Sequence, residues 1–155
     1  MDKLRPKRFI NCYVPTQACN FRCNYCYIGQ KKVFNNEMFH CIYPMEIMKK
    51  ATSKERLGGM CIFNLCAGGE TLLAPDILPV IKMLLENGHN VSIVTNGTIT
   101  ASFEKILEFP KELRRFLYIK FSFHYFELKR TEQFKVFFEN VHKIQNFVFD
   151  RYYTM

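Results

Sequence analysis

Residues 8–26 read RFINCYVPTQACNFRCNYC, and two kinds of sequence meet within this stretch. Residues 8–14 (RFINCYV) form a short, mostly apolar run, which is typical of a β-strand. Residues 19–26 (CNFRCNYC) then place Cys19, Cys23 and Cys26 at the spacing C-x3-C-x2-C. Because these cysteines directly follow the strand, we expect them in the loop at its carboxyl end, where α/β barrels build their active sites.

Three thiols crowded into one loop indicate a metal or iron–sulfur centre. Neighbouring thiolates repel one another unless a metal binds them, and soft thiolates favour zinc, Cu(I) or an iron–sulfur cluster. A structural zinc ion takes four ligands, so a zinc site would need Cys12, His40 or Cys41 as its fourth. A cubane cluster has four irons, and three thiolates leave one iron free for another ligand. These residues alone leave both interpretations open, with three buried, idle thiols as a third.

Short apolar runs alternate with amphipathic stretches along the rest of the chain. The pattern predicts strands over 8–14, 60–66, 91–95 and 116–125, and helices over 44–57, 74–87, 100–108 and 132–146. Nearly all-apolar strands are typical of a parallel sheet that is covered on both faces. Since a βα-barrel unit takes about 30 residues, the 155 residues hold about four units, with 147–153 as the start of a fifth strand. We therefore expect a single α/β domain over 1–155, an incomplete TIM-type βα barrel with parallel strands.

Composition and charge exclude several classes of protein. Hydrophobic residues make up 48% of the chain and charged residues 23%, as in a globular core. No apolar run is long enough to cross a bilayer, and the basic start of the chain lacks the apolar region of a signal peptide. We therefore expect a cytoplasmic protein with reduced thiols, in which an odd count of seven cysteines is not a disulfide framework. The net charge of +8 is scattered and gives no clear nucleic-acid signal.

The cysteine loop resembles the cluster loop of the radical S-adenosylmethionine (SAM) enzymes, in which an aromatic residue such as Tyr25 precedes the last cysteine. Gly68-Gly69-Glu70 follows the second predicted strand, as the GGE motif of that family does, although Thr71 stands where the family often has proline.

Two further features resemble the same family in the expected order. Thr95-Asn96-Gly97 ends the third predicted strand, and Ser122 and His124 lie near the end of the fourth. The resemblance runs from about residue 8 to residue 146, and it identifies the chain with the N-terminal part of the radical SAM core domain.

This resemblance implies a chemistry. In the family, the three cysteines bind three irons of a [4Fe-4S] cluster, and the amino and carboxylate groups of SAM chelate the fourth. One electron, from a donor such as flavodoxin or ferredoxin, cleaves SAM into methionine and a 5′-deoxyadenosyl radical. That radical abstracts a hydrogen atom from a substrate, which the sequence does not specify, and the sequence identifies no catalytic residue of the chain itself.

The resemblance also implies the residues that contact SAM. Glycines let a backbone approach a ligand closely, and a carboxylate accepts charge-assisted hydrogen bonds from an ammonium group. Alternation along the fourth strand would point Ser122 and His124 into the barrel. The implied contacts are Tyr25 beside the adenine, Gly68, Gly69 and Glu70 at the methionyl ammonium, Asn96 at the end of the third strand, Ser122 at the ribose, and His124 near SAM or substrate.

Two other interpretations belong to different classes. The chain could be a non-catalytic module that binds zinc or an iron–sulfur cluster, or an inactive fragment. The family's barrel usually has six βα units, so four units predict a truncated member or one that a second chain completes. The remaining cysteines (Cys12, Cys41, Cys61 and Cys66) lie in or near apolar segments and are expected to be buried hydrophobes. Cys66 is the one that directly precedes the proposed cofactor turn.

Overall fold

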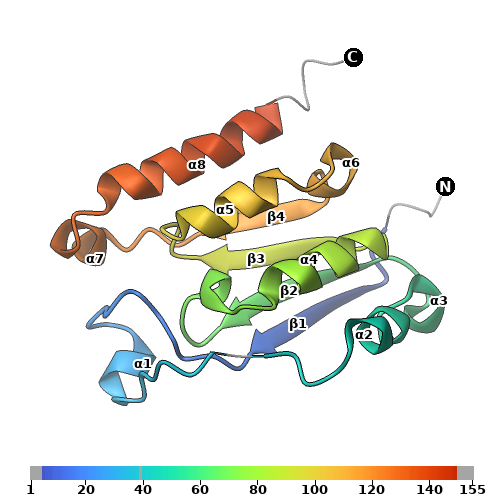
Figure 1. Ribbon diagram of the computed structural model, residues 1–155, viewed down its shortest axis with the longest axis horizontal. Helices are drawn as coiled ribbons and strands as arrows, with labels where there is room; N and C mark the ends of the chain where they lie inside the picture. Colours follow the sequence, from blue (N-terminus) through green and yellow to red (C-terminus); the bar gives the residue numbers. More distant parts are fainter. Residues whose placement is uncertain (1–4, 39, 150–155) are drawn as a thin grey trace.

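The computed structural model describes residues 5–38 and 40–149, and its centre is one sheet of four parallel strands (Figure 1). The strands lie in the order β1-β2-β3-β4, which is also their order along the chain. They are β1 (Arg8–Val14), β2 (Cys61–Ala67), β3 (Asn90–Thr95) and β4 (Leu117–Phe121). Each strand is followed by helical segments, so the predicted α/β class with parallel strands and four βα units is confirmed.

Helical segments connect the strands and extend beyond β4. The principal ones are α4, which packs on β3, and α5 and α8, which pack against each other. The segments are α1 (Tyr27–Gln30), α2 (Met45–Ala51), α3 (Lys54–Leu57), the 3₁₀ helix η1 (Thr71–Leu73), α4 (Ile77–Glu86), α5 (Thr100–Leu107), α6 (Lys111–Arg114), α7 (Tyr125–Arg130) and α8 (Phe134–Phe149).

The helix predicted over 44–57 is two helices, α2 and α3, separated at Thr52 and Ser53. The Thr52 hydroxyl bonds back to the Met48 carbonyl, and the Ser53 side chain accepts a hydrogen bond from the Arg56 backbone N–H as the N-cap of α3. Ser and Thr side chains compete with the helical backbone in this way, which ends one helix and starts another.

The fourth strand is shorter than predicted, because it ends at Phe121 and residues 125–130 form α7. The last ladder contact is the hydrogen bond from Ser122 N–H to the Thr95 carbonyl, and β3 itself ends at Thr95. The fifth strand predicted over 147–153 is wrong for residues 147–149, which continue α8, and residues 150–153 lie outside the described part of the chain.

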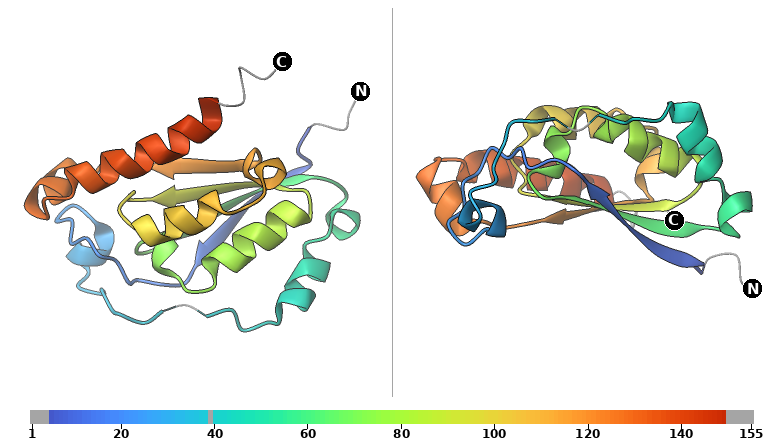
Figure 2. Two further views of the ribbon diagram at one scale, coloured as in Figure 1. Left: turned by 45° about the horizontal axis from the view of Figure 1, so that its top comes forward. Right: turned by 90° about the horizontal axis from the view of Figure 1, so that it is seen from below.

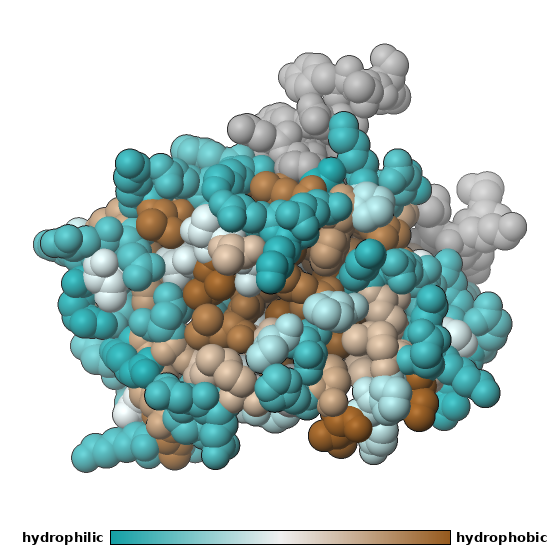
Figure 3. All heavy atoms as spheres, viewed as in Figure 1, coloured by the Kyte–Doolittle hydropathy of each residue, from teal (hydrophilic) through white to brown (hydrophobic). Residues whose placement is uncertain are grey.

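Among the described residues, helices cover only one face of the sheet, as Figure 2 shows. The apolar strands had predicted that both faces would be covered. Side chains alternate along each strand, so one set lies beneath α4 and α5 and the other faces away from them. Figure 3 shows the hydrophobic side chains that fill the space between the helices. The buried strand set is Cys61, Phe63, Leu65, Val91, Ile93 and Leu117, and the opposite, more exposed set includes Phe9, Asn11, Tyr13, Asn64, Cys66 and Tyr118.

A fully buried histidine ties the α2–α3 connection to the sheet. His89 is 0% exposed; its Nδ1 accepts the Cys61 backbone N–H at 3.1 Å, and its Nε2 lies 2.6 Å from the Thr52 carbonyl. A ring that accepts at Nδ1 and donates at Nε2 is neutral. Burial lowers the pKa of His89, with a smaller opposing effect from the Thr52 hydrogen bond.

Acid is therefore expected to destabilise the fold through His89. The folded-state pKa lies below the unfolded value, so the unfolded chain binds more protons, and stability is complete above about pH 6.5 and falls as the pH drops below it. Urea unfolding between pH 7 and 5 measures this loss, at most about 1.4 kcal/mol per pH unit. His89→Gln should flatten the pH slope, whereas His142→Gln, on an exposed residue of α8, should leave it unchanged. Equal slopes in the parent and His89→Gln would contradict the assignment.

Candidate functional site

The carboxyl ends of β2 and β3, together with the segments that follow β1 and β4, border one open pocket of about 180 Å³. Parallel strands bring their carboxyl ends to the same edge, which is why residues far apart in the sequence meet there. Nine of the ten predicted site residues line this pocket: Cys19, Cys23, Cys26, Gly68, Gly69, Glu70, Asn96, Ser122 and His124. The tenth, Tyr25, does not line it. Cys66, Thr95, Phe21 and Phe34 are among the other lining residues.

Glu70 is buried at the centre of the site, with 2% of its surface exposed. Its Oε1 accepts hydrogen bonds from the Thr95 hydroxyl at 2.6 Å and from Leu72 N–H at 3.0 Å, and its Oε2 accepts Asn96 N–H at 2.7 Å. Burial raises the pKa of Glu70, while these three hydrogen bonds act in the opposite direction. A carboxylate has about four acceptor positions, so one remains for a donor in the pocket.

The two glycines before Glu70 make room for the chain that leads into the cysteine loop. A Cβ on Gly69 would lie 2.0 Å from the Ala18 carbonyl oxygen, and one on Gly68 would lie 2.8 Å from the Tyr13 hydroxyl. Gly69 N–H donates to the Thr16 carbonyl and Glu70 N–H to the Ala18 carbonyl, each at 2.9 Å. The glycines were predicted to let a ligand approach the backbone closely. They also let the chain before the cysteine loop approach the same backbone.

Asn96 connects the end of β3 to the cysteine loop. Its Nδ2 donates to Asn20 Oδ1 at 2.8 Å, and Asn20 Nδ2 donates to the Thr98 hydroxyl at 2.8 Å. The Asn96 Oδ1 accepts from the same Thr98 hydroxyl and from Thr98 N–H, which closes a local Asx-type turn. Asn20 and Thr98 were not predicted as site residues, because neither the spacing nor the family motif marks them.

Two of the three loop cysteines, Cys19 and Cys23, lie in a partly dry environment. Burial raises the pKa of Cys19 to about 11, and burial also raises the pKa of Cys23. The Phe21 backbone N–H points at the Cys19 sulfur, 3.4 Å away. A thiolate is the form that binds metals, and a buried thiol loses its proton readily only when a cation compensates its charge.

This donor set fits a cluster better than a single ion. Within residues 5–38 and 40–149, no group of three His, Cys, Asp or Glu side chains is arranged to hold one metal ion. Ligands of a mononuclear zinc site must converge on one point, about 2.3 Å from each sulfur, whereas ligands of a cluster bind different irons and stand further apart. Three thiols that line one pocket, one of them with a backbone N–H directed at its sulfur, are compatible with the second arrangement.

Tyr25 and His124 form a pair at the rim of the pocket. The Tyr25 hydroxyl lies 2.7 Å from His124 Nδ1, and the two rings stack with centroids 5.9 Å apart. Burial lowers the pKa of His124, which favours the neutral imidazole. The tyrosine predicted to pack beside a ligand thus reaches the pocket through the histidine that lines it.

A contact from α7 that sequence reasoning missed holds the cysteine loop in place. The Glu127 carboxylate, 5% exposed, accepts the Arg22 backbone N–H at 2.9 Å and also pairs with the Arg130 guanidinium. The Arg130 hydrogen bond is the main cause that lowers the pKa of Glu127. The sequence signal was the Glu-x-x-Arg spacing on α7, which predicts the ion pair but not its target 105 residues away.

Replacing Glu127 by glutamine is expected to loosen the cysteine loop. The amide loses the negative charge that strengthens the bonds to Arg22 and Arg130, a cost of about 1.5–3 kcal/mol. Hydrogen exchange at the Arg22 amide should accelerate, as measured by NMR. Glu132→Gln, on an exposed residue just beyond α7, is the matched control and should leave that amide unchanged. An Arg22 amide with parental protection in Glu127→Gln would refute the role of this contact.

A parallel βα sheet whose carboxyl edge gathers three loop cysteines and a glycine-glycine-glutamate turn defines an α/β protein with a cofactor site. The chain belongs to the radical SAM superfamily, whose family model matches residues 13–151. Members of this superfamily use a [4Fe-4S] cluster and SAM, and the homologues found are enzymes.

The related curated proteins match about half of this chain. A 7-carboxy-7-deazaguanine synthase from Thermoplasma acidophilum is 36% identical over 93 residues, which are 57% of this chain and 38% of that protein. A probable GTP 3′,8-cyclase from Thermococcus kodakarensis is 33% identical over 84 residues, which are 54% of this chain and 25% of that protein. A GTP 3′,8-cyclase from Pasteurella multocida is 30% identical over 90 residues, 53% of this chain and 24% of that protein.

The matched segments therefore span well under two thirds of these relatives. No solved structure matches the chain significantly. No helix among the described residues is long and apolar enough to cross a membrane.

Proposed function

We propose that this chain is a radical SAM core domain over residues 1–155, in which Cys19, Cys23 and Cys26 hold a [4Fe-4S] cluster and the adjoining pocket binds SAM. The observation that carries the proposal is that the three cysteines, the Gly68–Glu70 turn and the ends of β3 and β4 all border one pocket. When bound, the cluster would supply one electron to the sulfonium of SAM, which yields methionine and a radical that abstracts hydrogen from a substrate.

The pocket residues would bind and orient SAM. The free acceptor position of Glu70 and the backbone of Gly68 and Gly69 suit the methionyl ammonium, because a buried carboxylate strengthens charge-assisted hydrogen bonds. Ser122 and His124 follow the end of β4 and line the pocket, where a hydroxyl and a neutral imidazole can each bond a ribose hydroxyl. Asn96, at the end of β3, would support the site through its contact with Asn20, and Tyr25, at the rim, would act through its contact with His124.

Anaerobic reconstitution tests the proposal directly. The protein should become brown and contain about four iron and four sulfide per chain. Adding SAM should change the electron paramagnetic resonance signal of the dithionite-reduced sample, because SAM would ligate the open iron. A colourless protein with one zinc would favour the non-catalytic module instead, and a protein that binds neither would favour an inactive fragment.

Glu70→Gln is expected to weaken SAM binding by about tenfold while the cluster is retained, since the neutral amide loses about 1.4 kcal/mol or more against an ammonium. Isothermal titration calorimetry with the reconstituted protein measures the affinity. Thr95→Val is the matched control, because it removes a hydrogen bond to the same carboxylate but leaves the charge. Equal losses of affinity in both variants would assign Glu70 a purely structural role.

A further inference from the structure

Two phenylalanines line the pocket beside the loop cysteines, and they are held in different ways. Phe21 is 1% exposed and packs in a core cluster with Cys23, Leu128 and Phe137, so the fold itself fixes its ring. Phe34 comes from the segment that follows α1. The proposed function gives Phe34 no role, although its ring borders the same space as the three cysteines.

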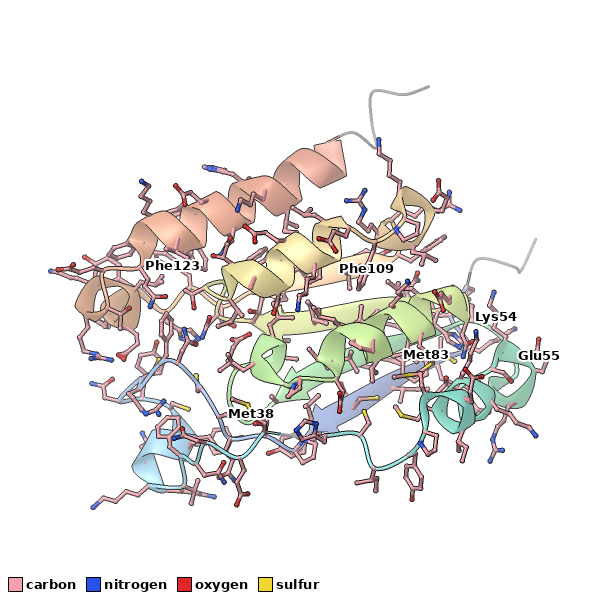
Figure 4. The ribbon with its side chains drawn as sticks, viewed as in Figure 1. Met38, Lys54, Glu55, Met83, Phe109 and Phe123 are labelled. Carbon is pink, nitrogen blue, oxygen red and sulfur yellow. The ribbon has the colours of Figure 1, made fainter. Side chains whose placement is uncertain are left out.

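Phe34 is the one inward-facing side chain of a surface segment. Residues 31–38 are all exposed except Phe34, which is half-buried. The Thr16 hydroxyl donates to the Glu37 carbonyl at 3.0 Å, which ties the far end of this segment to the residues that follow β1. Figure 4 labels Met38 there, near the carboxyl end of β1. The segment therefore passes over the site and places one aromatic ring in its pocket.

The end of α1 turns the chain back toward the cysteine loop. It forms a Schellman motif, in which Lys32 N–H donates to the Gly29 carbonyl and Val33 N–H to the Ile28 carbonyl, each at 3.1 Å. Lys32 adopts the left-handed φ of +54° that the motif requires, although glycine is usual at this position. The reversal brings the Phe34 ring back onto Gly29.

Two contacts hold the Phe34 ring against the cysteine loop. A Cβ on Gly29 would lie 3.2 Å from Phe34 Cε2 and 3.2 Å from the Cys23 carbonyl oxygen, so the ring and the loop backbone both border this glycine. The Arg22 guanidinium lies over the ring, 4.4 Å from its centroid, and also donates to the Cys19 carbonyl. Since a cation–π contact at an exposed site contributes about 0.5–1 kcal/mol, Arg22 joins the ring to the loop.

We propose that Phe34 shields the pocket: its ring keeps water and dissolved oxygen from the three cysteine sulfurs and from the cluster that they would hold, an inference that rests on the proposed function. The pocket is open, and Phe34 lies outside the helices and strands, so its ring closes a part that regular structure leaves uncovered. An apolar shell around a metal site controls the access of solvent to it. Removing the ring should therefore open the pocket without removing any ligand of the cluster.

Thiol alkylation tests the Phe34 shield without a cluster. In the full chain before reconstitution, iodoacetamide should alkylate Cys19 and Cys26 about fivefold faster in Phe34→Ala than in the parent, because the reactivity of a thiol follows its exposure and its thiolate fraction. Mass spectrometry of the peptides follows each cysteine separately. Cys61, which is 0% exposed, is the internal reference and should react at the parental rate.

Two further variants separate shielding from a general loss of stability. Phe109→Ala is the matched control, because Phe109, labelled in Figure 4, is also half-buried but follows α5 and packs against the main core. It should leave the alkylation of the loop cysteines unchanged. Phe34→Leu keeps an apolar side chain in place and should restore most of the parental protection. Loop cysteines that react equally fast in the two alanine variants would overturn the shield.

Bleaching in air tests the same shield with the cluster present. Reconstituted Phe34→Ala should lose its brown colour about fivefold faster than the parent, whereas Phe34→Leu and Phe109→Ala should stay close to the parental rate. If Phe34→Ala takes up a cluster that bleaches at the parental rate, the shield is refuted and the proposed function stands. If no variant takes up iron but the alkylation rates still depend on Phe34, the proposed function falls and the shield stands.

Discussion

Cys23→Ala is expected to stay colourless after anaerobic reconstitution, with iron and sulfide close to background. Cys23 is the middle cysteine of the loop and lies on the pocket wall with Cys19 and Cys26. A cluster held by three thiolates loses a third of its protein ligands when one is removed, and no other described side chain joins the remaining two in a metal-binding group. Iron and sulfide assays, together with the visible absorption spectrum, measure the loss.

Cys61→Ala is the matched control for this experiment. Cys61 is also buried, at 0% exposure, but it lies on β2 among the core residues beneath the helices. Both substitutions remove one sulfur from a packed site, so their costs in stability should be similar, about 1–2 kcal/mol. Iron that survives in Cys23→Ala, or that is lost equally in Cys61→Ala, would show that the ligand assignment is wrong.

Gly69→Ala is expected to destabilise the fold by about 3 kcal/mol and to lower cluster uptake with it. The added Cβ would lie 2.0 Å from the Ala18 carbonyl oxygen and 2.6 Å from its carbonyl carbon. Both atoms belong to the backbone, which the Glu70 N–H to Ala18 bond holds in register, so relief requires the chain before Cys19 to move. Urea unfolding gives the free energy, and iron assays give the uptake.

Gly58→Ala separates crowding from backbone strain. Gly58 has a φ of +76° and nothing within 4 Å of its Cβ position, so alanine there meets only the left-handed conformation, at about 1 kcal/mol. If the two alanine variants unfold at the same urea concentration, the contact between the GGE turn and the cysteine loop is not what requires glycine at position 69.

The identity of the site residues was predictable because each lies at a fixed point of a repeated unit. β1, β2, β3 and β4 were found from their apolar runs, and in a parallel sheet all carboxyl ends share one edge. A motif that follows a strand is therefore placed by the topology alone. This is why Cys19, Glu70 and Asn96 meet in one pocket, although 77 residues separate the first from the last.

The supporting contacts were not predictable, because they join segments with no shared pattern. Glu127 reaches the backbone of Arg22, and Asn20 bonds both Asn96 and Thr98. The predicted carboxyl end of the fourth strand was wrong for the same reason. The apolar run over 116–125 gives no sign that the hydrogen bonds between β3 and β4 end at Ser122. Nor does it indicate that Glu127 binds the cysteine loop.

The sequence by itself determined which segments form the strands, how the cysteines are spaced and which family the chain belongs to. Apolar periodicity and ligand spacing are local properties of the chain. Only the tertiary structure decided which side chains hold the site together. In the folded chain, the Glu70 carboxylate accepts hydrogen bonds from Leu72, Thr95 and Asn96. Within the described part of the chain, the tertiary structure also left one face of the sheet without a covering helix. Hydrogen-bond partners and exposed surfaces depend on how distant segments pack, and packing is settled only when the whole chain has folded.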